Sequence, residues 1–157
     1  MIKIRVVAVG KVKEKYFREA IEEYSVRLSR FCEFSVSEVK EENYDKPTPA
    51  LVKKIIADEG ERIKKAIKGY TVVFSPEGKK YSSEGFADRI KKLTDEGVGE
   101  ISFVIGGSYG IDGEVKRAAK ESVSFSDMTF PHTLARVMAL EQLYRAFMII
   151  TGSVYNK

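Results

Sequence analysis

The spacing of hydrophobic residues along the chain switches between the period of two that is typical of strands and the period of about 3.6 that is typical of helices. Residues 2–9 have the pattern of a strand that ends at Gly10, and residues 15–30 carry apolar side chains at helical spacing. The same alternation continues toward the C-terminus. It predicts further strands at 32–39, 70–74, 101–105 and 122–126, and further helices at 50–68, 83–96, 114–120 and 132–150. A strand–helix order repeated five times predicts an α/β fold with a parallel sheet, in a single domain spanning residues 1–157.

The last predicted helix, at 132–150, is apolar on nearly every side. Between Leu134 and Ile150 only four side chains are neither aliphatic, aromatic nor sulfur-bearing: Arg136, Glu141, Gln142 and Arg145. Such a helix must be buried over most of its surface, and a chain of 157 residues has little material to cover it. We therefore expect a homodimer packed through this helix; the alternative is the central helix of a monomer.

Composition excludes several classes of protein. No apolar run approaches the roughly 18 residues that a membrane span needs, and the first residues show no signal-peptide pattern, so we expect a cytoplasmic protein with no membrane partner. One cysteine and one histidine leave no disulfide framework and no metal cluster. The net charge of +4 comes from a basic excess in the first half of the chain. Such an excess favours a nucleic-acid partner, although a solvated surface has the same signature.

The sequence GGSYG at residues 106–110 fits the G-x-S-x-G pattern of a serine-hydrolase nucleophile elbow. On that interpretation Ser108 is the nucleophile, His132 is the base, and Asp112 or Asp127 completes the triad. The chain is short for such a hydrolase, and glycine-rich segments match the pattern by chance. A small serine hydrolase is therefore one hypothesis for this stretch.

A ligand-binding loop is the other hypothesis for the same stretch. Ligands of parallel sheets lie outside the carboxyl ends of the strands, and glycines let backbone approach a ligand closely. If all five strands are parallel, Gly10, residues 74–78, Gly106 and Ser126 all lie at the same edge of the sheet and can frame one pocket. Neither the Walker A nor the dinucleotide glycine pattern is present, so a nucleotide-like cofactor of another kind is expected.

Three segments together carry a family resemblance: FVIGGSYG at 103–110, SFSDMTFPH at 124–132 and RVMALEQLYRAFMIITG at 136–152. Over its full length the chain resembles the ribosomal RNA large subunit methyltransferase H family, of the SPOUT class. The resemblance implies a C-terminal trefoil knot and an obligate homodimer. It also implies transfer of a methyl group from S-adenosyl-L-methionine to N3 of a pseudouridine, in helix 69 of 23S rRNA within the assembled ribosome.

The resemblance also implies the positions of the site residues. Cofactor contacts are expected at Phe74, Gly106, Phe125, Ser126, Asp127, Met128, Thr129 and Phe130. Many relatives carry leucine in place of Phe74, and relatives usually end in Tyr-His where this chain has Tyr155-Asn156. The proton acceptor is thus unassigned.

Further candidates lie on the last helix and after the first strand. Tyr155 is a candidate for orienting the substrate, and Arg136 and Arg145 either pair with Glu141 or reach RNA. His132 is expected to hold the loop before the helix. The basic residues expected to contact rRNA phosphates, or to form an ordinary exposed helix start, are Lys11, Lys13, Lys15 and Arg18. A non-catalytic, nucleotide-binding module associated with the ribosome is the third function left open.

Overall fold

Five parallel strands form one sheet in the order β2-β1-β4-β3-β5. The computed structural model describes residues 1–155. The strands are β1 (Lys3–Val9), β2 (Glu33–Val39), β3 (Tyr70–Lys80), β4 (Glu100–Ile105) and β5 (Glu121–Ser124). Every pairing between neighbouring strands is parallel, which confirms the predicted α/β class.

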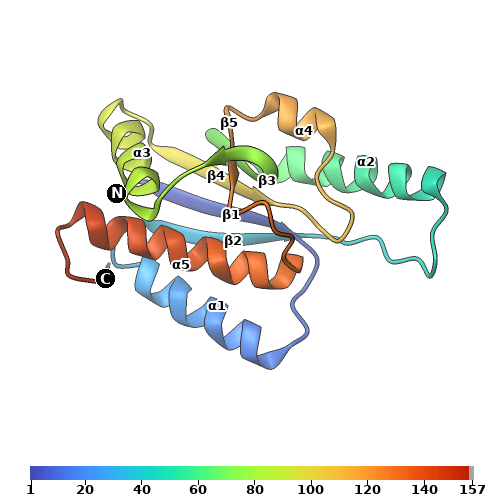
Figure 1. The fold of residues 1–157 in the computed structure, drawn as a ribbon, viewed down its shortest axis with the longest axis horizontal. Coiled ribbons are helices and arrows are strands. Elements are labelled where there is room, and N and C mark those ends of the chain that lie inside the picture. The colour runs from blue at the N-terminus through green and yellow to red at the C-terminus, as the bar shows by residue number, and fades with distance from the viewer. Residues whose placement is uncertain (156–157) are drawn as a thin grey trace.

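Helices cover both faces of this sheet (Figure 1). They are α1 (Lys15–Leu28), α2 (Pro49–Ala66), α3 (Ser83–Asp95), α4 (Gly113–Ala118) and α5 (His132–Ile150). Helices α1, α3 and α5 share one apolar core with the sheet, and α2 and α4 share a second core on the opposite face. The result is three layers, with α5 between α1 and α3.

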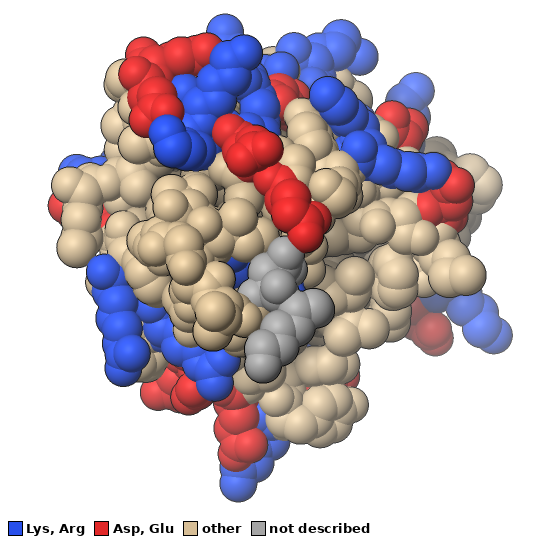
Figure 2. Space-filling view, turned by 60° about the vertical axis from the view of Figure 1, so that its left-hand side comes forward, with Lys and Arg blue, Asp and Glu red and all other residues tan. Residues whose placement is uncertain are grey.

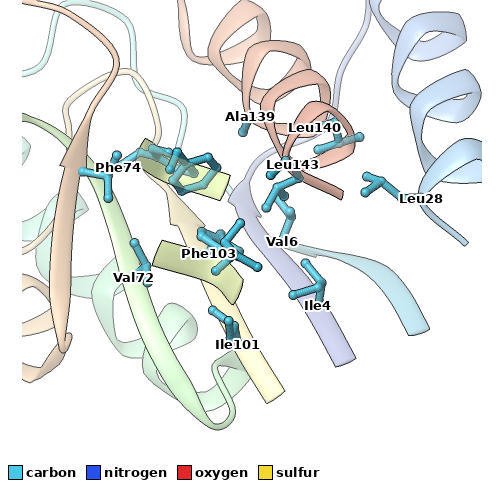
Figure 3. Packing of buried hydrophobic residues seen from close by; sticks show 14 of the residues in the cluster. Ile4, Val6, Leu28, Val72, Phe74, Ile101, Phe103, Ala139, Leu140 and Leu143 are labelled. Atoms are coloured by element: carbon cyan, nitrogen blue, oxygen red, sulfur yellow. The ribbon is translucent and has the colours of Figure 1, made fainter. Parts of the chain in front are cut away.

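The two cores explain why the central strands β1 and β4 are mostly apolar. Along β1, Ile4 and Val6 face the core of α1, α3 and α5, while Val7 faces the core of α2 and α4. Successive side chains of a strand point to opposite faces, so a sheet covered on both sides needs apolar residues at every position. Figure 3 shows Phe103 of β4 between Val72 of β3 and Val6 of β1.

Helix α5 is buried on one side only. Leu140 and Leu143 point toward the sheet and are fully buried, as Figure 3 shows. Leu134, Val137 and Met138 are only partly covered in the single chain. Figure 2, which brings the left-hand side of Figure 1 forward, shows uncharged side chains across much of the middle of that face, with charged side chains toward its margins. The helix predicted at 132–150 is confirmed, and its apolar outer side is left without a full cover.

Strand β3 corrects one sequence prediction. The sequence predicts a strand that ends at Phe74 and a turn over residues 76–79, but β3 continues to Lys80. β5 pairs with β3 up to Phe74, and pairs again at Lys79 and Lys80 after a register shift. Gly78 passes so close to β5 that a Cβ atom there would lie 2.6 Å from the carbonyl carbon of Ser122. Polar, turn-forming residues are thus held in the strand by contact with β5.

Candidate functional site

A pocket of about 670 Å³ opens at the carboxyl ends of β4 and β5, beside residues 74–76 of β3. Three segments form most of its wall: residues 74–76, residues 105–108 and residues 128–132. The lining includes every cofactor residue expected from the sequence except one: Phe74, Gly106, Phe125, Ser126, Met128, Thr129 and Phe130. The strand-end pocket expected from a parallel sheet is therefore present.

Two expected residues lie elsewhere. Asp127 is exposed, and its carboxylate pairs with Lys80 of β3, so it is not part of the pocket lining. Gly10 was expected to help frame the pocket, but it does not line it. Its carbonyl oxygen instead accepts a hydrogen bond of 3.0 Å from Arg136 of α5. The pocket lies at the ends of β4 and β5 and beside the middle of β3, whereas β1 lies on the other side of β4, next to β2.

The glycine loop, residues 106–110, owes its shape to the missing side chains. A Cβ atom on Gly106 would lie 2.6 Å from Cγ1 of Ile111 and 3.0 Å from the carbonyl group of Gly110. Gly110 has a φ of +94°, a left-handed conformation that residues with a Cβ atom rarely adopt. Its N–H donates to the carbonyl oxygen of Gly107 at 3.1 Å. The loop thus closes on itself and presents backbone to the pocket.

Aromatic rings form the apolar part of the wall. The rings of Phe74 and Phe125 are stacked, with centroids 4.4 Å apart and planes 9° apart. Phe103 lies behind Phe74, with its centroid 5.8 Å away. Phe74 and Phe125 also border a second hollow of about 370 Å³, which lies between α3 and α5. Flat apolar walls beside exposed backbone suit a ligand with a planar ring and several hydrogen-bonding groups.

The structure does not assemble a hydrolase triad. Ser108 and His132 both line the pocket, but within residues 1–155 no hydrogen bond joins them. Asp112 caps α4 by accepting the N–H of Glu114 at 3.3 Å, and Asp127 pairs with Lys80. A nucleophilic serine needs a base within hydrogen-bond reach and an acid that orients the base. Neither aspartate is placed to orient His132, which favours the binding-loop interpretation of GGSYG.

Arg145 and Tyr155 form a cluster with Glu141, outside the pocket lining. Arg145 Nη2 lies 2.6 Å from Glu141 Oε1, which confirms pairing with Glu141 as one of the two roles expected for this arginine. The Tyr155 hydroxyl lies 3.3 Å from the same oxygen, and the guanidinium lies 4.8 Å from the Tyr155 ring centroid. Burial raises the pKa of Tyr155 to about 12, so the phenol stays protonated near neutrality. Tyr155 is thus suited to orienting a group and not to accepting a proton; Asn156 lies outside the described residues.

The predicted basic residues lie beside another groove. Lys11 and Arg18 line a hollow of about 530 Å³ between α1 and β2, while Lys13 and Lys15 are exposed nearby. Arg18 Nη1 donates to the backbone carbonyl of Lys13 at 3.0 Å, and Lys15 pairs with Glu19 at 3.7 Å. None of the four lines the strand-end pocket.

Sequence reasoning missed the roles of two residues near the pocket. Arg136, with 2% of its surface exposed, pairs with Glu38 of β2 at 2.5 Å. It was expected to pair with Glu141 or to reach RNA, and its burial and its pairing with Glu38 correct that expectation. Lys116 lines the pocket and binds Glu77 at 2.6 Å. Both pairs join residues far apart in the sequence, so no local spacing could have indicated them.

Two kinds of feature are absent from residues 1–155. No group of three or more His, Cys, Asp and Glu side chains is placed to hold a metal ion. No helix in this part of the chain is long and apolar enough to cross a membrane.

The fold and the pocket define an α/β protein with a pocket, walled partly by backbone, at the ends of parallel strands. A family model described as "Predicted SPOUT methyltransferase" matches residues 2–156. The chain belongs to this family, and the resemblance to the ribosomal RNA large subunit methyltransferase H group is confirmed. The Levilactobacillus brevis protein of that name is 48% identical over 157 residues, covering 98% of this chain and 99% of its own length.

Solved structures of low sequence identity share the fold. A probable methyltransferase from Bordetella pertussis Tohama I has a TM-score of 0.53 and 13% identity, with 93% of this chain and 96% of that chain covered. A putative methyltransferase from Legionella pneumophila, in complex with the bound cofactor SAM, has a TM-score of 0.50 and 14% identity. That match covers 92% of this chain and 66% of the Legionella chain.

Proposed function

We propose that the protein is an S-adenosyl-L-methionine-dependent methyltransferase that modifies N3 of a pseudouridine in helix 69 of 23S rRNA, within the assembled ribosome. The observation that carries the proposal is the convergence of the expected cofactor residues, all but Asp127, on one strand-end pocket. The name of the Levilactobacillus brevis relative, which specifies large-subunit ribosomal RNA, supports the substrate. The Legionella neighbour, which holds SAM, supports the cofactor.

The residues present fit this cofactor. S-adenosyl-L-methionine supplies an activated methyl group on a sulfonium, so the protein's main task is to orient donor and acceptor. Phe74 and Phe125 offer apolar ring surfaces for a nucleoside base. The backbone of the glycine loop and of residues 126–130 offers donors and acceptors for the polar groups. In the transfer, the carbon–sulfur bond breaks as the carbon–N3 bond forms, and the N3 proton leaves to water or to a basic group.

Calorimetry with S-adenosylhomocysteine tests the site. The wild-type chain should bind one ligand per protomer, and Gly106→Val should abolish binding because even a Cβ atom there collides with Ile111. Val98→Ala, at a half-buried position at the opposite end of the sheet, serves as a control and should bind as the wild type does. A fluorophosphonate probe should leave Ser108 unlabelled. Labelling of Ser108, or no binding by the wild type, contradicts the proposal.

A second copy of the chain is the proposed cover for the outer side of α5, where Leu134, Val137 and Met138 are only partly buried. An apolar helix face that is left partly uncovered is typical of homodimer interfaces. Sedimentation should show a wild-type dimer and a shift toward monomer in Met138→Arg. A wild-type monomer at micromolar concentration would contradict this part. The trefoil knot stays a prediction that accompanies the family.

The basic residues that follow β1 are proposed to contact rRNA phosphates. Lys11→Ala, Lys13→Ala and Lys15→Ala together should lower ribosome affinity and reduce the salt dependence of binding, because each phosphate contact releases counterions. A matched control replaces Lys53, Lys54 and Lys65, which are exposed on α2. An unchanged salt slope in the first triple variant, or an equal loss in the control, would exclude this contact.

Tyr155 and Arg145 are proposed to orient the substrate. Their cluster with Glu141 already fixes both side chains, so little ordering is needed when substrate binds. Tyr155→Phe should lower kcat with the affinity for S-adenosylhomocysteine unchanged. A wild-type kcat in Tyr155→Phe would show that the Tyr155 hydroxyl has no role in the reaction.

A further inference from the structure

A buried glutamate lies beneath the glycine loop. Glu59 of α2 has 3% of its surface exposed. The next residue, Gly60, brings α2 into contact with the chain that follows the loop. A Cβ atom on Gly60 would lie 2.5 Å from Oδ2 of Asp112. Helix α2 is therefore packed tightly against this edge of the pocket.

The two carboxyl oxygens of Glu59 have different surroundings. Oε2 accepts the backbone N–H of Glu42 at 3.2 Å. Oε1 is buried and, among the described residues, has no hydrogen-bond partner. It faces the glycine loop, because a Cβ atom on Gly107 would lie 3.3 Å from it. Gly107 has no side chain, so the group that Oε1 approaches is the loop backbone.

An unpaired buried acceptor is costly, and native proteins keep few of them. Glu59 is not needed to fill space, since an apolar side chain would fill the same volume at lower cost. Burial raises the pKa of Glu59, and the nearby carboxylate of Glu41 raises it further, while Arg62 on α2 acts in the opposite direction. Whether ionised or neutral, the carboxyl group keeps an oxygen that can accept a hydrogen bond.

We propose that Glu59 is a positioning residue for the glycine loop: when the cofactor binds, Oε1 accepts a loop N–H and fixes the backbone that contacts the ligand. The inference rests on the proposed function, because it assumes that the pocket binds S-adenosyl-L-methionine. Glu59 itself does not touch the ligand. It acts through residues 107 and 108, which lie between α2 and the pocket.

The test compares two substitutions at the same position. Glu59→Gln keeps an acceptor oxygen and the shape of the side chain, whereas Glu59→Met keeps the volume and removes both oxygens. Calorimetry should show a Kd for S-adenosylhomocysteine within threefold of wild type for Glu59→Gln, and at least tenfold higher for Glu59→Met. Ile63→Val, on the same helix but in the core of α2 and α4, should reduce stability without changing the Kd.

Thermal melting of the same proteins separates positioning from folding. A rise in Kd for Glu59→Met, with a melting temperature no lower than that of Ile63→Val, supports the positioning role. Gly107→Ala approaches the contact from the loop side and should also weaken binding, because its Cβ atom would lie 3.3 Å from Oε1 and 3.0 Å from Cγ1 of Val9.

Two results would overturn the inference: a wild-type Kd in both Glu59→Met and Gly107→Ala, or equal weakening in Glu59→Gln and Glu59→Met. A wild-type chain that fails to bind S-adenosylhomocysteine contradicts the proposed function itself. The two failures are distinguishable. If only the inference is wrong, the wild-type chain still binds S-adenosylhomocysteine; if the proposed function is wrong, it does not.

Discussion

Replacing Arg136 by methionine should destabilise the protein more than any exposed arginine substitution. The Arg136 side chain starts one turn into α5 and reaches the ends of β1 and β2. Its guanidinium pairs with Glu38 at 2.5 Å and donates to the backbone carbonyls of Gly10 at 3.0 Å and Val9 at 3.3 Å. It therefore ties the start of the last helix, and the pocket wall that precedes it, to the sheet.

The expected loss follows from these contacts. Removing one partner of a buried, hydrogen-bonded ion pair costs about 3–5 kcal/mol. Glu38 keeps 40% of its side chain exposed and is resolvated when Arg136 is removed, which lowers the cost. The carbonyls of Val9 and Gly10 lose their charged donor, at roughly 1–3 kcal/mol for an unsatisfied buried group. We expect a net loss of about 3 kcal/mol in the free energy of unfolding.

Urea unfolding of Arg136→Met and wild type, at one protein concentration, measures this loss. Arg27→Met is the matched control, because Arg27 forms an exposed ion pair with Glu23 on α1, and its removal should shift the midpoint little. Since Arg136 anchors the wall that holds His132, Arg136→Met should also weaken S-adenosylhomocysteine binding. A loss below about 1 kcal/mol, or one no larger than in the control, would refute the anchoring role.

Three further predictions concern single side chains. Burial raises the pKa of the Cys32 thiol to about 12, so a thiol reagent at about pH 8 should label the chain only after unfolding; rapid labelling of the native protein would contradict this. The ion pair with Lys116 lowers the pKa of Glu77 from its ordinary value of 4.5 to about 2. The pair therefore stabilises the folded protein fully above about pH 4.5, and this stabilisation is lost as the pH falls toward 2. The melting-temperature gap between wild type and Lys116→Met should shrink over that window, and a constant gap would exclude the pair. Ser108→Ala should keep most of the methyl-transfer activity, and its complete loss would revive the nucleophile hypothesis.

The sequence predicted the elements and their class because burial on both faces leaves a plain signal. The apolar runs at 2–9 and 101–105 correspond to β1 and β4. Ser82 caps α3 by accepting the N–H of Gly85 at 3.0 Å, a contact between near neighbours in the sequence. These features depend on neighbours in the sequence, so local patterns are sufficient to find them.

Long-range contacts were not predictable in the same way. The strand order places β1 between β2 and β4, a neighbourhood that no local pattern encodes. Gly78, Lys79 and Lys80 have turn-like chemistry, yet contact with β5 keeps them in β3. The Arg136–Glu38 pair joins residues 98 positions apart. Each of these depends on which segments meet after folding.

The candidate site was also predictable only in part. The resemblance indicated which segments to expect in a cofactor site, and the structure brings most of those residues to one pocket. It could not show that Asp127 points away toward Lys80, or that an unpaired oxygen of Glu59 lies against Gly107. Both contacts join residues far apart in the sequence, so no local pattern indicates them.

Methyl transfer to ribosomes is the most direct measurement of the central claim. Purified protein and methyl-labelled S-adenosyl-L-methionine are incubated with ribosomes that lack this modification, and the labelled nucleotide is mapped in 23S rRNA. We predict label on N3 of one pseudouridine in helix 69, with no label in a reaction containing Gly106→Val. Absence of label where the relative from Levilactobacillus brevis transfers it, or label on another RNA, would contradict the account.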